Sequence, residues 1–263
     1  MQRLSPFKQH LLLFTRSFSL GIKDTKTLLA LSFFLLASLL IFTYIWKALD
    51  ISLLTQEQLI WYVALNHFVI FSLPDIQPRM KQDIETKTVM LWQEKNPSYL
   101  ITTFLSSLGL FLARLSILGL ISLVFIRTQA NLLPFSPASL GLFLFLSIPA
   151  GIVALLFWMI LGLLTFFYKE ADYIHWTCKK LCFFLGGLIL PLSLYPSWIH
   201  SFTKWTPFSL ILGERSSLIL GYSNQDILYL FLSYLGWIAL EVGLLILLHQ
   251  KGLERLQRRS SNS

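Results

Sequence analysis

Three residues place ionisable side chains inside predominantly apolar stretches: His67, Arg114 and Glu241. An arginine at the centre of a membrane costs about 2.5–3.5 kcal/mol even on the lenient insertion scale, so such side chains must face protein or water. If their helices touch, Arg114 and Glu241 can form an ion pair that orients those helices. His67 and Asn66 can join the same polar layer. A contact with a transported substrate is the functional alternative.

No recognisable catalytic or metal-binding motif accompanies these residues. The sequence contains no GxxxxGK[ST], HExxH or GxSxG pattern, and its five histidines do not fall at the spacing of a metal site. Cys178 and Cys182 are four residues apart, which suits small apolar fillers on one face of a helix better than a disulfide. We therefore predict no catalytic residue, no metal and no bound cofactor in this chain.

The segment 74–99 carries both signs of charge between two apolar stretches. Its charged residues include Arg79, Lys81, Asp83, Glu85 and Lys87. Ile76, Met80 and Ile84 recur every four positions, which predicts a short helix with one apolar edge that starts near Pro78. Such a helix suits docking to a cytoplasmic partner. A solvated loop is the alternative.

A run of glycine and proline follows at 186–199. Gly186, Gly187, Pro191 and Pro196 interrupt backbone hydrogen bonding inside an apolar stretch. Two interpretations remain open. One is a kinked helix ending in an aromatic belt of Tyr195, Trp198 and Trp205. The other is a broken, re-entrant outer segment that shapes a pathway.

Composition identifies the elements that must carry these residues. Apolar residues make up 55% of the 263 residues and charged residues only 13%, against about 25% charged in a soluble domain. The mean hydropathy is +0.67. These values exclude a disordered chain and a disulfide scaffold, and they make a freely soluble enzyme untenable. The net charge of +8 then indicates cytoplasmic loops rather than a nucleic-acid surface.

Charge-free windows predict an all-α, polytopic membrane protein that forms a single domain over 1–263. The six expected spans are 28–46, 54–73, 100–126, 138–168, 181–199 and 227–248. Of the 21 Lys and Arg residues, Arg114 lies within a span. The only basic residues expected outside are Lys47, Arg127, Lys204 and Arg215. This positive-inside bias places both termini in the cytoplasm.

The first 27 residues predict an amphipathic helix rather than a signal peptide. Its apolar residues are spaced three and four apart and are Leu4, Phe7, Leu11, Phe14 and Phe18. Lys8, His10 and Arg16 lie between them. We expect this helix to lie in the cytoplasmic interface before the first span, with a solvated helix as the alternative.

This combination resembles the ABC-2-type permeases, a family of membrane-spanning transporter subunits. The similarity covers most of the chain as architecture, and Phe157–Trp158 adds to it. The specific motif consists of Gly187, Pro191, Leu192, Pro196 and Trp198, then Pro207 and Phe208. The chain looks closest to a bacterial six-span subfamily in which two permeases occur with one separate ATPase.

The resemblance implies a permease subunit of an exporter in the bacterial cytoplasmic membrane. A partner ATPase would bind ATP and Mg²⁺ and receive the loop 74–99. The outer motif would form short helices that dip back toward the membrane. The other partners would be membrane lipid and a second permease, identical or related. Two rivals remain: a stand-alone secondary transporter that uses Arg114, Glu241 and His67, and a membrane-embedded hydrolase or transferase, for which no motif is present.

Overall fold

The computed structural model describes residues 5–48, 56–89, 99–129, 137–168, 170–188, 190–217 and 224–261. Helices form nearly all of this part of the chain, and no β-strand occurs within it. Leu4 and the second part of the charged loop, residues 90–98, lie outside the described residues. The predicted all-α fold class is therefore confirmed for the described residues.

Five long helical segments are apolar enough to cross a membrane. The helices that form them are α2 (Thr25–Ala48), α3 (Gln56–Ser72) continuing into α4 (Ile76–Glu85), α6 (Tyr99–Gln129), α7 (Pro137–Leu163) and α12 (Asn224–Ser261). Each of these segments contains one of the predicted spans or matches it to within a few residues, with one exception. The span predicted over 138–168 is α-helical only as far as Leu163 and continues as the 3₁₀ turn η1 (Leu164–Phe166).

The span predicted over 181–199 is not a continuous helix. Helix α8 (Ala171–Leu185) begins ten residues earlier and ends at Leu185. The chain then passes through Gly186 and Gly187 to the 3₁₀ turn η2 (Leu192–Leu194). Its continuation consists of short helices, namely α9 (Ser197–Thr203), α10 (Pro207–Ile211) and α11 (Gly213–Ser217).

Helix α1 (Pro6–Lys23) forms where the amphipathic helix was expected, and it packs along α6. The two helices approach closely at Gly109, where a Cβ atom would lie 2.7 Å from the carbonyl oxygen of Phe14. Glycine is therefore required at position 109. Phe7 and Leu11 remain exposed on the side of α1 that faces away from the bundle.

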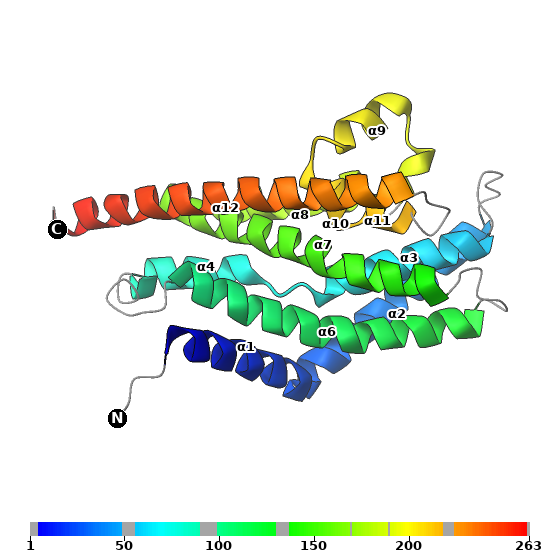
Figure 1. Cartoon of the computed structure of the whole chain (residues 1–263), viewed down its shortest axis with the longest axis horizontal. Coiled ribbons are helices and arrows are strands. Elements are labelled where there is room, and N and C mark those ends of the chain that lie inside the picture. Colours follow the sequence, from blue (N-terminus) through cyan, green and yellow to red (C-terminus); the bar gives the residue numbers. More distant parts are fainter. Residues whose placement is uncertain are drawn as a thin grey trace.

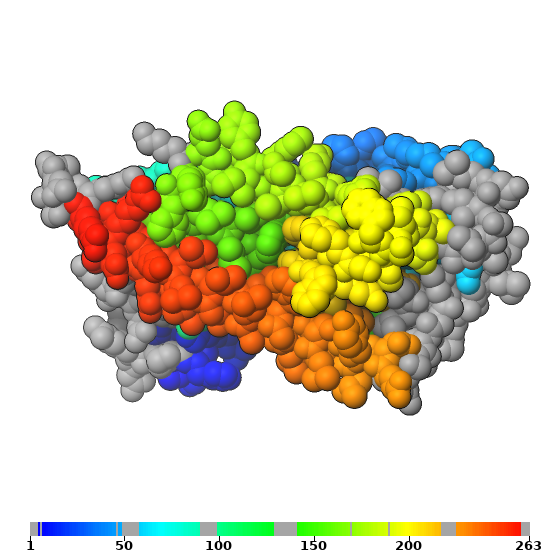
Figure 2. Space-filling view, turned by 90° about the horizontal axis from the view of Figure 1, so that it is seen from above, coloured from blue at the N-terminus to red at the C-terminus, as the bar shows by residue number. Residues whose placement is uncertain are grey.

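The long helices run along one axis of the molecule (Figure 1). The first turn of α1 and the last turns of α12 lie at the same end, together with α4. Helix α9 stands out from the bundle on one face (Figure 2). Within the apolar windows, 72% of the α3 residues and 61% of the α7 residues are buried, against 22% for α2 and for α12. Helices α3 and α7 thus form the core, while α2 and α12 present apolar faces outward.

Candidate functional site

The apolar edge predicted for the charged loop is present in α4 and packs on α7. Ile76, Met80 and Ile84 are all buried. Met80 covers Gly162 of α7, where an added Cβ atom would lie 2.8 Å from the Met80 sulfur. The helix begins at Ile76, two residues before Pro78. Proline is tolerated there because N–H groups of the first helical turn have no partner within the helix.

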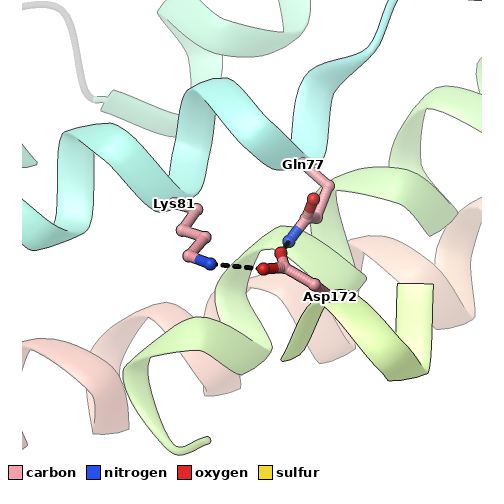
Figure 3. Close-up of polar contacts among 3 residues, drawn as sticks. All are labelled: Gln77, Lys81 and Asp172. Atoms are coloured by element: carbon pink, nitrogen blue, oxygen red, sulfur yellow. Dashed lines mark hydrogen bonds and ion pairs between the residues drawn. The ribbon is translucent and has the colours of Figure 1, made fainter. Parts of the chain in front are cut away.

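Helix α4 is joined to the first turn of α8 by a polar cluster that Figure 3 shows. Gln77 Nε2 donates a hydrogen bond of 2.9 Å to Asp172 Oδ1, and Lys81 Nζ forms an ion pair with Asp172 Oδ2. Lys179 adds a second ion pair, 3.2 Å from Asp75 Oδ1, just before α4 begins. We call Gln77, Lys81, Asp172, Asp75 and Lys179 the α4–α8 clamp. It fixes α4 to α8 at two points.

The contacts among Gln77, Lys81 and Asp172 also shift the pKa values of Asp172 and Lys81. Hydrogen bonds from Lys81 and then from Gln77 lower the pKa of Asp172 below 3.8. The hydrogen bond to Asp172 raises the pKa of Lys81 above 10.5. Both side chains therefore stay charged throughout the physiological range.

The other charged residues of α4 divide into two groups. Arg79 Nη1 lies 3.4 Å from Ser106 Oγ, and Asp83 accepts a 3.0 Å hydrogen bond from the hydroxyl of Tyr99. Glu85 and Lys87 are exposed at the end of the helix, where Lys87 adopts a left-handed conformation with φ of 56°. Among the five predicted docking residues, Glu85 and Lys87 are thus the best placed to meet a partner.

The break after α8 is built around Gly187, which has φ of +76°. Freed backbone carbonyls are satisfied by tyrosines: Tyr62 donates to the oxygen of Gly187 at 2.8 Å, and Tyr195 donates to that of Phe184 at 2.5 Å. The irregular backbone predicted around Pro191 and Pro196 is therefore confirmed. Its position at the outer face stays a prediction.

The flanks of this broken segment differ in exposure. Pro207 and Phe208 of the predicted motif are buried in α10. Trp198 and Trp205, by contrast, are exposed, with 73% and 83% of their surface accessible. That contrast fits side chains at an interface or against a partner better than a packed core.

Arg215 is the functional candidate that sequence reasoning missed, because it was assigned to an outer loop. It is fully buried in α11, and its guanidinium carbon lies 4.6 Å from the ring centroid of Phe143. Nη1 donates to Ser147 Oγ at 3.2 Å and Nη2 to Asn66 Oδ1 at 3.3 Å. No carboxylate of the described residues forms an ion pair with it, and its Nε has no acceptor there. The available signal was its position between two apolar runs, 208–212 and 218–220.

The predicted polar layer is not assembled. Arg114 is partly buried, and the acidic groups that act electrostatically on it are Asp24, between α1 and α2, and Asp75. Glu241 is buried, and neither carboxylate oxygen has a hydrogen-bond partner within the described part of the chain. An Arg114–Glu241 ion pair is therefore absent. His67 lies elsewhere, with Nδ1 2.8 Å from the oxygen of Val63 and its ring against Phe42.

Metal ligands are not gathered anywhere in the described ranges: no group of three or more His, Cys, Asp or Glu side chains could hold an ion there. Cys178 is partly buried, Cys182 is buried, and both are free thiols. Burial raises the pKa of the Cys178 thiol. These thiols are thus poor nucleophiles.

No protein-family model matches the sequence, and no curated protein matches it. The candidate site therefore rests on its own geometry. That geometry consists of a short charged helix on the core, a clamp to α8, and a broken segment directly after α8.

Proposed function

We propose that this chain is the permease subunit of an ABC-2-type ABC transporter, an exporter of the cytoplasmic membrane. A separate ATPase would bind and hydrolyse ATP, and a second permease, identical or related, would complete the pathway. The observation that carries the proposal is the mechanical connection of α4. One edge of this helix rests on α7, and its polar side chains are clamped to α8.

The order of the elements along the chain links α4 to the broken segment through α8. Helix α8 ends at Leu185, immediately before the break at Gly187. A displacement of α4 by a partner would move α8 through Asp172, and α8 would carry that movement to the broken segment. Closure of an ATPase beneath α4 could in this way be converted into rearrangement of a gate.

The test uses a charge swap at the exposed end of α4. Glu85→Lys with Lys87→Glu keeps the net charge of the loop and its number of Lys and Arg residues. The positive-inside rule therefore predicts unchanged membrane insertion. Asp83 is left intact because it accepts the hydrogen bond from Tyr99. Tagged wild-type chain, gently extracted from its native membrane, is expected to carry Mg²⁺-dependent, vanadate-sensitive ATP hydrolysis. The ATP hydrolysis that co-purifies with the swapped variant should be lower by a factor of at least about ten.

Lys47→Glu serves as the matched control, because Lys47 is an exposed basic residue in the last turn of α2, a helix that takes no part in the clamp. The control should retain the activity. Absence of any associated ATPase from the wild type, with transport still present, would refute the proposal.

One observation favours a second candidate, the stand-alone secondary transporter. Glu241 is a buried carboxyl group whose two oxygens lack partners in the described residues. Such a group inside an apolar helix contact is typical of proton-coupled carriers. Transport that persists without ATP and stops when a proton gradient is abolished would support this candidate. Transport that follows ATP alone would exclude it.

A further inference from the structure

Helix α12 extends well beyond its apolar part. It contains 38 residues, whereas the apolar stretch ends at Leu248. The remaining residues, 249–261, extend the helix by roughly 20 Å at 1.5 Å per residue. The headgroup layer on one side of a bilayer is only about 5–8 Å thick. The tip of α12 therefore passes through that layer.

This extension is fixed to the rest of the molecule. Gly252 contacts the ring of Phe166, where an added Cβ atom would lie 2.4 Å from Cδ2, and Leu253 is buried. The guanidinium carbon of Arg255 lies 5.8 Å from the ring centroid of Phe167. These contacts hold the extension as a defined surface rather than a mobile tail.

The extension and α4 both contact Tyr99 and the 3₁₀ turn η1. Tyr99 stacks on His249 of α12, with ring centroids 6.3 Å apart, and the same tyrosine donates its hydroxyl to Asp83 of α4. Both helices also contact η1. The two elements lie at one end of the molecule (Figure 1). A partner that meets α4 therefore has the extension beside it.

The exposed side of the extension is basic. Lys251, Arg255 and Arg258 are four and three residues apart, which places them along one stripe. Glu254, three residues after Lys251 and four before Arg258, lies on the same stripe, which thus carries three basic residues and one acidic residue. Lys251 and Arg255 are both exposed. A basic stripe on a fixed helix is complementary to an acidic surface.

We propose that the cytoplasmic extension of α12 is a second docking element for the ATPase, binding an acidic patch of that subunit beside α4. This inference rests on the proposed function. Membrane headgroups are the other anionic surface in reach. They are disfavoured at Arg255, which lies seven residues, or roughly 10 Å, past Leu248 and so beyond the headgroup layer, whereas Lys251, roughly 5 Å past Leu248, lies within that layer.

The decisive experiment reverses the stripe and keeps α4 unchanged. Lys251→Glu with Arg255→Glu is compared with Lys251→Arg with Arg255→Lys, which preserves both charges. The probe is the ATPase that co-purifies with the wild-type chain, measured as protein and as vanadate-sensitive hydrolysis. We expect the reversed variant to retain at most about a tenth of it and the charge-preserving variant to retain it within twofold.

The outcomes separate the two hypotheses. Equal retention by the reversed variant and the wild type would overturn the docking role of α12 and leave the proposed function standing. No ATPase on the wild type would overturn both. In addition, a fluorophore at Glu254→Cys, with Cys178 and Cys182 replaced by alanine, is placed in lipid vesicles without ATPase. Strong quenching by a headgroup-attached quencher would assign the stripe to the membrane instead.

Discussion

Arg215 is a buried cation that is held by neutral groups. Its partners are the hydroxyl of Ser147, the amide oxygen of Asn66 and the ring of Phe143. Arginine remains charged in proteins, so this cluster carries the cost of desolvating a charge without a carboxylate to offset it. The cluster nevertheless joins α11 to α3 and α7. Its members should therefore respond to mutation in unequal ways.

Asn66→Leu should destabilise the protein more than Arg215→Met. The first change leaves a buried charge with one acceptor fewer, which costs about 1–3 kcal/mol in the free energy of unfolding. The second removes the charge and keeps the volume, which is often neutral or stabilising. Thermal unfolding in detergent gives the comparison. The double variant should recover most of the loss, and a larger loss for Arg215→Met than for Asn66→Leu would contradict this account.

At the scale of elements, the α4–α8 clamp should depend on pH only at the extremes. The pKa of Asp172 is depressed in the folded state, so its contribution is fully present above the unfolded pKa near 3.8 and is lost as pH falls through the lower folded value. The pKa of Lys81 is raised, so its contribution is present below 10.5 and is lost as pH rises through the higher folded value. The Lys81–Asp172 ion pair of the clamp should thus remain intact from about pH 5 to pH 10.

Asp172→Asn should loosen α4 inside that window. Hydrogen exchange of the α4 amides is the measurement, and the expected increase is at most about fivefold because exposed ion pairs are weak. High salt should produce part of the same increase in the wild type and little in the variant. Unchanged exchange in Asp172→Asn would show that the Lys81–Asp172 ion pair does not hold α4, and would leave that role to the Lys179–Asp75 ion pair and the packing of Met80 on Gly162.

The broken segment allows a labelling prediction. Single cysteines from Leu192 to Trp205, in a chain whose Cys178 and Cys182 are replaced, should react with an impermeant thiol reagent added outside. Exposed positions such as Trp198 should react faster than buried Leu192. Protection of every position before Trp205, or labelling from the cytoplasm alone, would place this segment elsewhere.

The elements differ in how far the sequence predicts them. Ile76, Met80 and Ile84 predicted the buried edge of α4, because a four-residue period on a short helix has one structural solution. Pro191 and Pro196 predicted the break, because proline removes a backbone donor wherever it stands. The start of α8 at Ala171 was missed, since Asp172, Lys179 and Lys180 interrupt the apolar pattern. The use of Asp172 and Lys179 in the clamp depends on tertiary contacts with α4, which no local pattern shows.

For the candidate site, the sequence likewise does not predict which charged side chains meet in the folded chain. Arg114 and Glu241 were both identified as charges within apolar helices, yet no local pattern says which helices touch. Arg114 interacts electrostatically with Asp24, which lies between α1 and α2. Glu241, by contrast, has no hydrogen-bond partner among the described residues. The burial of Arg215 was not predicted, because this arginine stands beside Glu214 in a segment between two predicted spans.

At the scale of the whole molecule, the common location of the α1 start and the α12 end predicts a common side for both termini (Figure 1). Tags at the two ends should both be digested by protease in inverted membrane vesicles and both be protected in intact cells. Cysteine at Lys47 should show the reverse accessibility. One terminus on each side would require an odd number of crossings, with the broken segment failing to return the chain across the membrane.

The close packing of α1 against Gly109 also affects when α1 can fold onto the bundle during synthesis. Helix α1 leaves the ribosome before α6, yet it packs against Gly109 of α6, more than eighty residues later in the chain. Until that stretch has been synthesised and inserted, the face of α1 that carries Phe14, Phe18 and Gly21 has only the lipid surface to contact. A nascent chain arrested before Gly109 should therefore keep α1 open to protease, and a chain arrested well beyond α6 should protect it. Gly109→Val should keep α1 exposed even in the finished protein, because the added side chain would occupy the place of the Phe14 carbonyl.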